Sequence, residues 1–291
     1  MIRIVVDSTC DMPAAFMEEH NVVTLPLHVM AQGREYLDRV TIDTEEVYAL
    51  MRRDVMPTTA QVNPAEAYQG LRPLVEQGDD VLCLPFSAKM SSTCQAITMA
   101  GRELEEEFPG RRVVVLDSRS GSLGIGLIAM EAVRAAEAGC SMDRVARRCR
   151  FLIEHVEHLF VITNLDWMIR GGRISRTMGF TANLLHIKPI LQVREGEMEV
   201  IHKVRGEKKS LERVADLTAQ RISNCPRQLV GIAHASDLAA AQAMRALLEK
   251  RLPDCTFVIE EIGAVLGVHL GIGGVGVLFF NQLEETSQQP V

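Results

Sequence analysis

The sequence predicts an α/β protein with two domains. An N-terminal doubly wound parallel-sheet domain is followed by an α+β domain with a mixed sheet. The chain has 291 residues, of which 47% are hydrophobic, and this is enough for two buried cores. In the first half, short β-branched runs alternate with helical patterns, as is typical of a parallel sheet. In the second half, two strand-like runs flank a short turn, which indicates a hairpin and therefore antiparallel neighbours.

Continuous apolar runs in the first half predict buried strands of a sheet that helices cover on both faces. These runs span residues 2–6, 80–84 and 112–116. Helical patterns follow at residues 65–77, 94–108 and 127–139. Asn63 and Pro64 suit the N-cap and the first position of the first helix, and Gly139 suits the C′ position of the third. The repeated order of strand and helix predicts the doubly wound domain.

The second half has a different pattern, in which two strands form a hairpin and the other strands alternate with helices less regularly. Strands are predicted at residues 159–164, 188–193, 198–204, 228–234, 256–262 and 275–280. Helices are predicted at residues 210–222 and 238–252. We place the domain boundary near residue 160, so the domains are residues 1–160 and 161–284, and we expect 285–291 to be a flexible tail.

Composition excludes several classes of protein. The net charge is −7 and the pI is near 5.7, which argues against general nucleic-acid binding. The seven cysteines are odd in number and form no C-x-x-C pair, so we expect free thiols in a reducing cytoplasm rather than disulfides or a zinc site. The first residues do not resemble a signal peptide, and we expect no integral membrane segment.

A glycine-rich stretch near the C-terminus matches the dinucleotide fingerprint G-x-G-x-x-G at residues 271–276. That fingerprint needs a strand before it and a helix after it, whereas here a strand-like run follows. We therefore exclude a dinucleotide cofactor. The glycines either allow tight turns or leave room for a ligand beside His269. A single histidine in apolar surroundings is more often structural.

Hydroxyl-rich segments follow all three predicted strands of the first half, at residues 7–11, 87–93 and 117–122. Ligands bind at this edge of open parallel sheets, and hydroxyls beside a helix N-terminus suit an anion. The alternative is ordinary helix capping, although one cap needs only one hydroxyl. We expect the segments to line one cleft. The candidate lining residues are Ser92, Thr93, Ser118 and Gly271.

Other segments carry weaker signals. Residues 56–64 are rich in turn formers and are interpreted as a loop. Basic residues gather at 170–176 and 188–209, where they form either a solvated face or a dock for a phosphate or an acidic partner. The sequence lacks a P-loop, a nucleophile elbow and an H-E-x-x-H motif. These absences favour binding over catalysis.

Taken together, ordered motifs along nearly the whole chain resemble the DegV family of bacterial fatty-acid-binding proteins. The motifs are DSTCD, TTAQVNP, FSAKMSSTCQA, LDSRSGSLGIG, MIRGGRIS, NLLHIKPIL and HKVRGEKK. The resemblance implies a cleft between the two domains that buries one long acyl chain. It also implies that Thr59, Ser91 and His269 bind the carboxylate, with His269 in its protonated form as one option. No catalytic residue, metal or cofactor is implied.

The resemblance further implies a partner. A separate ATP-dependent fatty acid kinase would phosphorylate the presented carboxylate, and the carrier would hold the fatty acid or acyl phosphate for phospholipid synthesis. Arg173 and Arg205 would lie toward the side that docks the kinase. Two other functions stay open: a stand-alone phosphotransferase or Ser-dependent hydrolase that uses the same cleft, and a regulatory protein that senses lipid.

The sequence departs from the family pattern at a few positions. Ala60 and Val62 replace a serine and a proline, Ser92 replaces a glycine, and Cys94 replaces a bulkier aromatic residue. The threonine and the first serine that bind the carboxylate in the family are retained. Cys94 would widen the cavity, so the preferred chain length does not follow from the resemblance.

Overall fold

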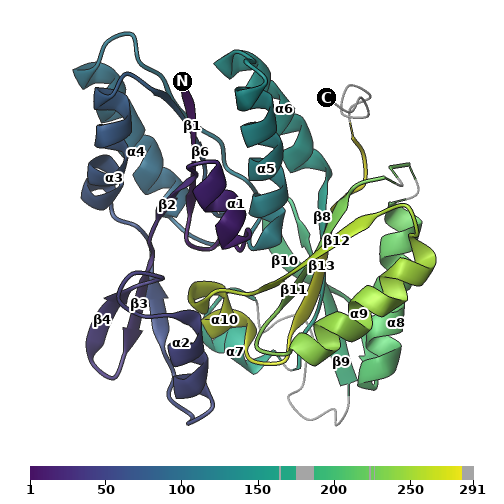
Figure 1. Ribbon diagram of the computed structural model, residues 1–291. Helices are drawn as coiled ribbons and strands as arrows, with labels where there is room; N and C mark the ends of the chain where they lie inside the picture. The colour runs from purple at the N-terminus through teal and green to yellow at the C-terminus, as the bar shows by residue number, and fades with distance from the viewer. Residues whose placement is uncertain (164, 175–186, 223, 226, 284–291) are drawn as a thin grey trace.

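The computed structural model describes residues 1–163, 165–174, 187–222, 224–225 and 227–283 (Figure 1). The predicted tail at 285–291 lies outside these residues. The predicted elements are present, and their ends lie within four residues of the expected positions. The α/β fold class, with a parallel sheet followed by a mixed sheet, is confirmed. No helix among the described residues is long and apolar enough to cross a membrane.

The first sheet is parallel, in the order β2-β1-β6-β7. Its strands are β1 (Ile2–Asp7), β2 (Val23–Leu25), β6 (Asp80–Leu84) and β7 (Val113–Val115). The helices around it are α1 (Ala14–Glu19), α3 (Pro64–Glu76), α4 (Thr93–Glu107), α5 (Leu123–Glu137) and α6 (Met142–His155). Figure 1 shows α3 and α4 on one face and α5 and α6 on the other, as the doubly wound prediction requires. Asn63 caps α3 in a capping box with Glu66.

A small antiparallel sheet, β4-β3-β5, was not predicted. It contains β3 (His28–Ala31), β4 (Arg34–Leu37) and β5 (Thr58–Ala60), and helix α2 (Thr44–Met51) connects β4 to β5. The interpretation of residues 56–64 as a loop is therefore wrong at β5. The reason is that β5 is three residues long and gains its hydrogen bonds from β3, which lies about thirty residues earlier in the chain. Its register sets Thr59 opposite Val29.

The second sheet is mixed, in the order β10-β9-β8-β13-β11-β12. Its strands are β8 (Val156–Val161), β9 (Ile187–Arg194), β10 (Glu197–Arg205), β11 (Leu229–His234), β12 (Thr256–Glu261) and β13 (Val275–Phe280). The predicted hairpin is confirmed, since Glu195 and Gly196 take positive φ between β9 and β10. Helices α8 (Glu207–Arg221) and α9 (Leu238–Arg251) cover this sheet. The boundary at 160 stays a prediction, and β8 spans it.

Helix α5 joins the two sheets into one body. It contacts β1 of the first sheet and β8, β11 and β13 of the second, and Figure 1 shows it between them. Ten of its fifteen residues are buried, including Ile125 and Ile128. A helix that is apolar on all sides must be covered on all sides, which explains why it lies at the centre of the molecule.

Two further helices are short, α7 (Asp166–Arg170) and α10 (Ala264–Leu270), and α10 was not predicted. They contact each other, and α10 also contacts α2, β3 and β5. The glycine-rich stretch thus has a helix before it and strand β13 after it, the reverse of a dinucleotide-binding loop. Gly271 and Gly273 take φ values of +76° and +88°, which form the tight connection between α10 and β13.

Candidate functional site

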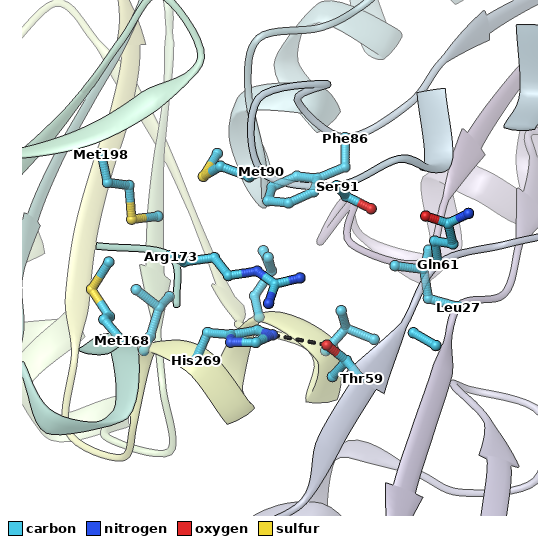
Figure 2. Close-up of a pocket in the computed structure, with 14 residues that line it drawn as sticks. Leu27, Thr59, Gln61, Phe86, Met90, Ser91, Met168, Arg173, Met198 and His269 are labelled. Atoms are coloured by element: carbon cyan, nitrogen blue, oxygen red, sulfur yellow. Dashed lines mark hydrogen bonds between the residues drawn. The ribbon is translucent and has the colours of Figure 1, made fainter. Parts of the chain in front are cut away.

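A pocket lies where α10, β5 and the loop after β6 meet residues of the second half of the chain (Figure 2), and it encloses about 500 Å³ of empty space when the solvent at its open side is included. Its lining residues come from both halves. They are Leu27, Thr59, Ala60, Gln61, Phe86, Met90, Ser91, Met168, Arg173, Met198, Val265, Leu266, His269 and Leu270. Figure 2 shows Met90, Met168 and Met198 on one side, and Thr59 and Gln61 on the other. The pocket therefore has an apolar part and a polar part.

The structure brings together the three residues that the family resemblance assigns to the carboxylate. Thr59, Ser91 and His269 all line the pocket. Thr59 Oγ1 lies 2.8 Å from His269 Nε2, and a hydrogen bond joins them across 210 positions of sequence. Ser91 lies just before α4, where its Oγ accepts a hydrogen bond from the backbone N–H of Thr93. The Ser91 and Thr93 hydroxyls also share a hydrogen bond of 3.0 Å.

His269 is uncharged at neutral pH in this site. Burial, together with the nearby charge of Arg173, lowers the pKa of its imidazole to about 4. A protonated His269 as the counter-ion of a bound carboxylate stays a prediction, because a carboxylate beside the ring would raise the pKa of the imidazole. A neutral imidazole hydrogen-bonds to its neighbours but supplies no charge.

The positive charge in the pocket comes from Arg173. Figure 2 shows its guanidinium above the His269 ring, directed toward the Thr59 side of the pocket. Its Nη1 donates a hydrogen bond of 2.6 Å to the carbonyl oxygen of Gly171. Within the described part of the chain, Arg173 forms no salt bridge. Sequence reasoning assigned Arg173 to kinase docking and did not expect it in the pocket, and the only signal was its place after two glycines.

The four residues expected to line the cleft lie elsewhere among the described residues. Ser92 is exposed and precedes α4, whereas Thr93 is buried and supports Ser91. Ser118 is buried and its Oγ accepts a hydrogen bond from the backbone N–H of Ser120. Gly271 faces the Trp167 ring, because a β-carbon there would lie 2.4 Å from the Cδ1 atom of that ring. These positions are next to the site rather than in the pocket wall.

The acidic residues at the strand ends hold the loops together. The buried carboxylate of Asp7 accepts a hydrogen bond of 2.7 Å from the backbone N–H of Phe86. The buried carboxylate of Asp11 accepts hydrogen bonds from the Ser122 hydroxyl and from the backbone N–H of Gly263, at the start of α10. Asp11 therefore fixes α10, the helix that carries His269, against the loops that follow β1 and β7.

The remaining predicted residues have simpler positions. Arg205 ends β10 and is not among the described residues that line the pocket. Ala60 lines the pocket, but Cys94 is buried in α4 outside the lining, so its effect on cavity width stays a prediction. Among the described residues, no group of three His, Cys, Asp or Glu side chains is arranged to hold a metal ion.

A serine–histidine pair does occur, but away from the pocket. The Ser120 Oγ lies 2.6 Å from His158 Nε2, and both residues are at most 1% exposed. Burial lowers the pKa of His158 to about 3. A substrate has no access to such a pair, so its hydrogen bond serves the packing of α5 against β8.

The fold and the pocket define a class of protein: an α/β chain with a parallel and a mixed sheet, and a pocket with one polar and one apolar part. Comparison with known proteins gives the family. A family model described as an uncharacterised protein of the DegV family matches residues 1–282. The chain therefore belongs to the DegV family.

Individual relatives are similar over almost their full length. A DegV domain-containing protein of Caldanaerobacter subterraneus subsp. tengcongensis is 32% identical, over 96% of this chain and 98% of the relative. A structure described as fatty acid binding of a DegV family protein from Thermus thermophilus is 32% identical, with a TM-score of 0.87 and coverage of 96% and 99%. A stearic acid-binding protein from Eubacterium ventriosum is 25% identical, with a TM-score of 0.88 and coverage of 96% and 98%.

Proposed function

We propose that this protein binds one long-chain fatty acid in the pocket, with the carboxylate at the polar end. The observation that carries the proposal is that the pocket combines two hydroxyls and the Arg173 guanidinium, which has no salt bridge among the described residues, with three methionine side chains. A carboxylate attached to an alkyl chain matches both parts. Structures of similar DegV proteins from Thermus thermophilus and Eubacterium ventriosum are described as fatty-acid-binding, which supports the same assignment.

The two ends of the ligand would contribute differently. Each buried CH₂ is worth about 0.8 kcal/mol, so about fourteen of them give roughly 11 kcal/mol before the costs of association. Each hydrogen bond to the charged head contributes about 1.5–3 kcal/mol. The chain would therefore supply most of the affinity. Thr59, Ser91 and Arg173 would fix the position of the carboxylate and offset its desolvation.

Native mass spectrometry tests this proposal. Protein that is purified gently is expected to carry an added mass equal to one fatty acid. Delipidated protein is expected to take up one equivalent of palmitate or oleate. A bare polypeptide mass in the first experiment and no uptake in the second would overturn the proposal.

We further propose that the bound carboxylate is presented in the cytoplasm to a separate ATP-dependent kinase, and that the protein then holds the acyl phosphate for phospholipid synthesis. Arg205 lies outside the pocket lining, which suits a residue that contacts a partner instead of the ligand. The variant Arg205→Ala is expected to reduce acyl phosphate formation with a fatty acid kinase and ATP, while palmitate affinity stays the same. Arg227→Ala, at an exposed arginine before β11, is the matched control. Equal rates for wild type and Arg205→Ala would contradict the docking role.

The structure adds no observation in favour of a stand-alone enzyme. Among the described residues, the Ser91 hydroxyl bonds to Thr93 and not to a base, and the buried Ser120–His158 pair lies outside the pocket lining. ATP turnover or ester hydrolysis by the protein alone, abolished by Ser91→Ala, would nevertheless establish that function in place of a carrier.

A further inference from the structure

Gly171, the C-cap residue of α7, has a backbone conformation that does not require glycine. Its φ and ψ are −71° and −9°, which any L-residue adopts readily. Its neighbour Gly172 is different, because its φ of +71° favours glycine. The absence of a side chain at Gly171 therefore needs another explanation.

The explanation lies in the distance to His269. A β-carbon at Gly171 would lie 2.2 Å from the Nδ1 atom of His269 and 3.0 Å from its Cε1 atom. Non-bonded atoms do not approach to 2.2 Å, so a side chain at this position would displace the imidazole. The absence of a side chain at Gly171 thus leaves the space that the His269 ring occupies.

The packing of Gly171 against the ring also determines which nitrogen of His269 carries the proton. Nδ1 faces Gly171, is buried, and has no hydrogen-bond partner among the described residues. Nε2 has Thr59 Oγ1 at 2.8 Å. A proton on Nδ1 would leave a buried N–H donor unsatisfied, and buried donors without a partner are rarer in proteins than buried acceptors without one. The proton therefore lies on Nε2 and is donated to Thr59 Oγ1, which leaves the Thr59 hydroxyl proton free for a ligand.

Gly171 contacts the second polar group of the pocket as well. Its carbonyl oxygen accepts the 2.6 Å hydrogen bond from Arg173 Nη1. One residue therefore sets the position of the imidazole through its missing side chain and the position of the guanidinium through its backbone. Both groups line the polar end of the pocket.

We infer that Gly171 is a positioning residue that fixes His269 as its Nε2-protonated tautomer and anchors Arg173, so that Thr59 and Arg173 together receive an anionic head group. The identity of that head group as a fatty acid carboxylate rests on the proposed function. The position of the His269 ring and its tautomer do not depend on the identity of the head group.

The test compares Gly171→Ala with Gly172→Ala, because the two adjacent glycines separate a clash from backbone strain. A β-carbon at Gly172 would meet no atom within 4 Å, so that variant strains the backbone without touching the site. Gly171→Ala is expected to weaken palmitate binding by about tenfold or more, and Gly172→Ala by less than about twofold. In a His269→Ala background, Gly171→Ala is expected to cause no further loss, because the ring it displaces is gone.

The ¹⁵N chemical shifts of the His269 imidazole give a readout that needs no ligand. Wild-type protein is expected to show a protonated Nε2 and an unprotonated Nδ1, and Gly171→Ala is expected to change this pattern. If Gly171→Ala unfolds while the double variant with His269→Ala folds, the clash is supported. If both unfold, the inference is contradicted.

Three further results would overturn it: a wild-type proton on Nδ1, unchanged affinity and shifts in Gly171→Ala, or equal losses in both backgrounds. Failure of wild-type protein to bind palmitate would overturn the proposed function instead, and the chemical shifts would still decide the role of Gly171.

Discussion

Replacing Thr59 by valine isolates the hydroxyl that the account places at the head group. Valine keeps the shape and the strand preference of threonine, so β5 is expected to keep its pairing with β3. The change removes the oxygen that bonds to His269 Nε2 at 2.8 Å and that would bond to the ligand. Everything else in the pocket stays in place.

The size of the effect follows from the hydrogen bond that is lost. A hydrogen bond to a charged group contributes about 1.5–3 kcal/mol, so the dissociation constant of palmitate should rise about 10- to 150-fold. The free energy of unfolding without ligand should also fall by about 1–3 kcal/mol, because His269 Nε2 loses its partner in a mostly buried position. Both effects come from one atom.

Isothermal titration calorimetry of delipidated protein measures the affinity, and urea unfolding measures the stability. Thr58→Val is the matched control, since Thr58 lies in the same strand but is exposed and outside the pocket lining. Its affinity and stability should both stay near those of wild type. Unchanged palmitate affinity in Thr59→Val, or an equal loss in Thr58→Val, would refute the placement of the carboxylate at Thr59.

Three further predictions concern charge, pH and packing. Replacing Arg173 by methionine should weaken palmitate binding about tenfold or more but change the binding of the uncharged alcohol hexadecanol little, as calorimetry with both ligands can show. The pKa of His269 in the folded protein lies near 4, below its ordinary value, so the unfolded chain binds a proton at this residue more readily. In urea unfolding, wild type should therefore lose about 2 kcal/mol more stability than His269→Gln when the pH falls from 7 to 5. Parallel pH profiles of the two proteins would contradict this. A β-carbon at Gly124 would lie 2.2 Å from both Ser120 Oγ and His158 Nε2, so Gly124→Ala should lower the free energy of unfolding by about 1–3 kcal/mol or more, and wild-type stability in that variant would show that the buried pair is loosely packed.

The sequence predicted those parts of the fold that depend on local pattern. The strands β1 and β6 contain the apolar runs 4–6 and 81–84, and α3 begins after the expected Asn63 cap. The turn at Glu195 and Gly196 was also visible, because hairpin turns need residues that tolerate positive φ. Each of these signals lies within a few residues of the element it specifies.

The missed parts depend on contacts between distant residues. The short strand β5 forms through pairing with β3, and α10 is held by the Asp11 carboxylate, which lies 252 positions away from Gly263. The same reason applies to the site. Thr59 and His269 became candidates together through the family resemblance, since no local pattern links residues 210 positions apart.

Arg173 and Gly171 show the limit most clearly. Its charge and the family resemblance placed Arg173 on a solvated or docking face, and only the fold brings its guanidinium to the His269 ring. Gly171 has no sequence signal that distinguishes it from Gly172. In the structure, a β-carbon at Gly171 would collide with the His269 imidazole, whereas a β-carbon at Gly172 would lie in open space.

The most direct test of the central claim is a crystal structure of the protein with palmitate bound. We expect the carboxylate within hydrogen-bonding distance of Thr59 Oγ1, Ser91 Oγ and the Arg173 guanidinium, and the alkyl chain against the methionines that line the pocket. A palmitate that binds elsewhere, or that lies in the pocket with its carboxylate at the methionine side, would contradict the account.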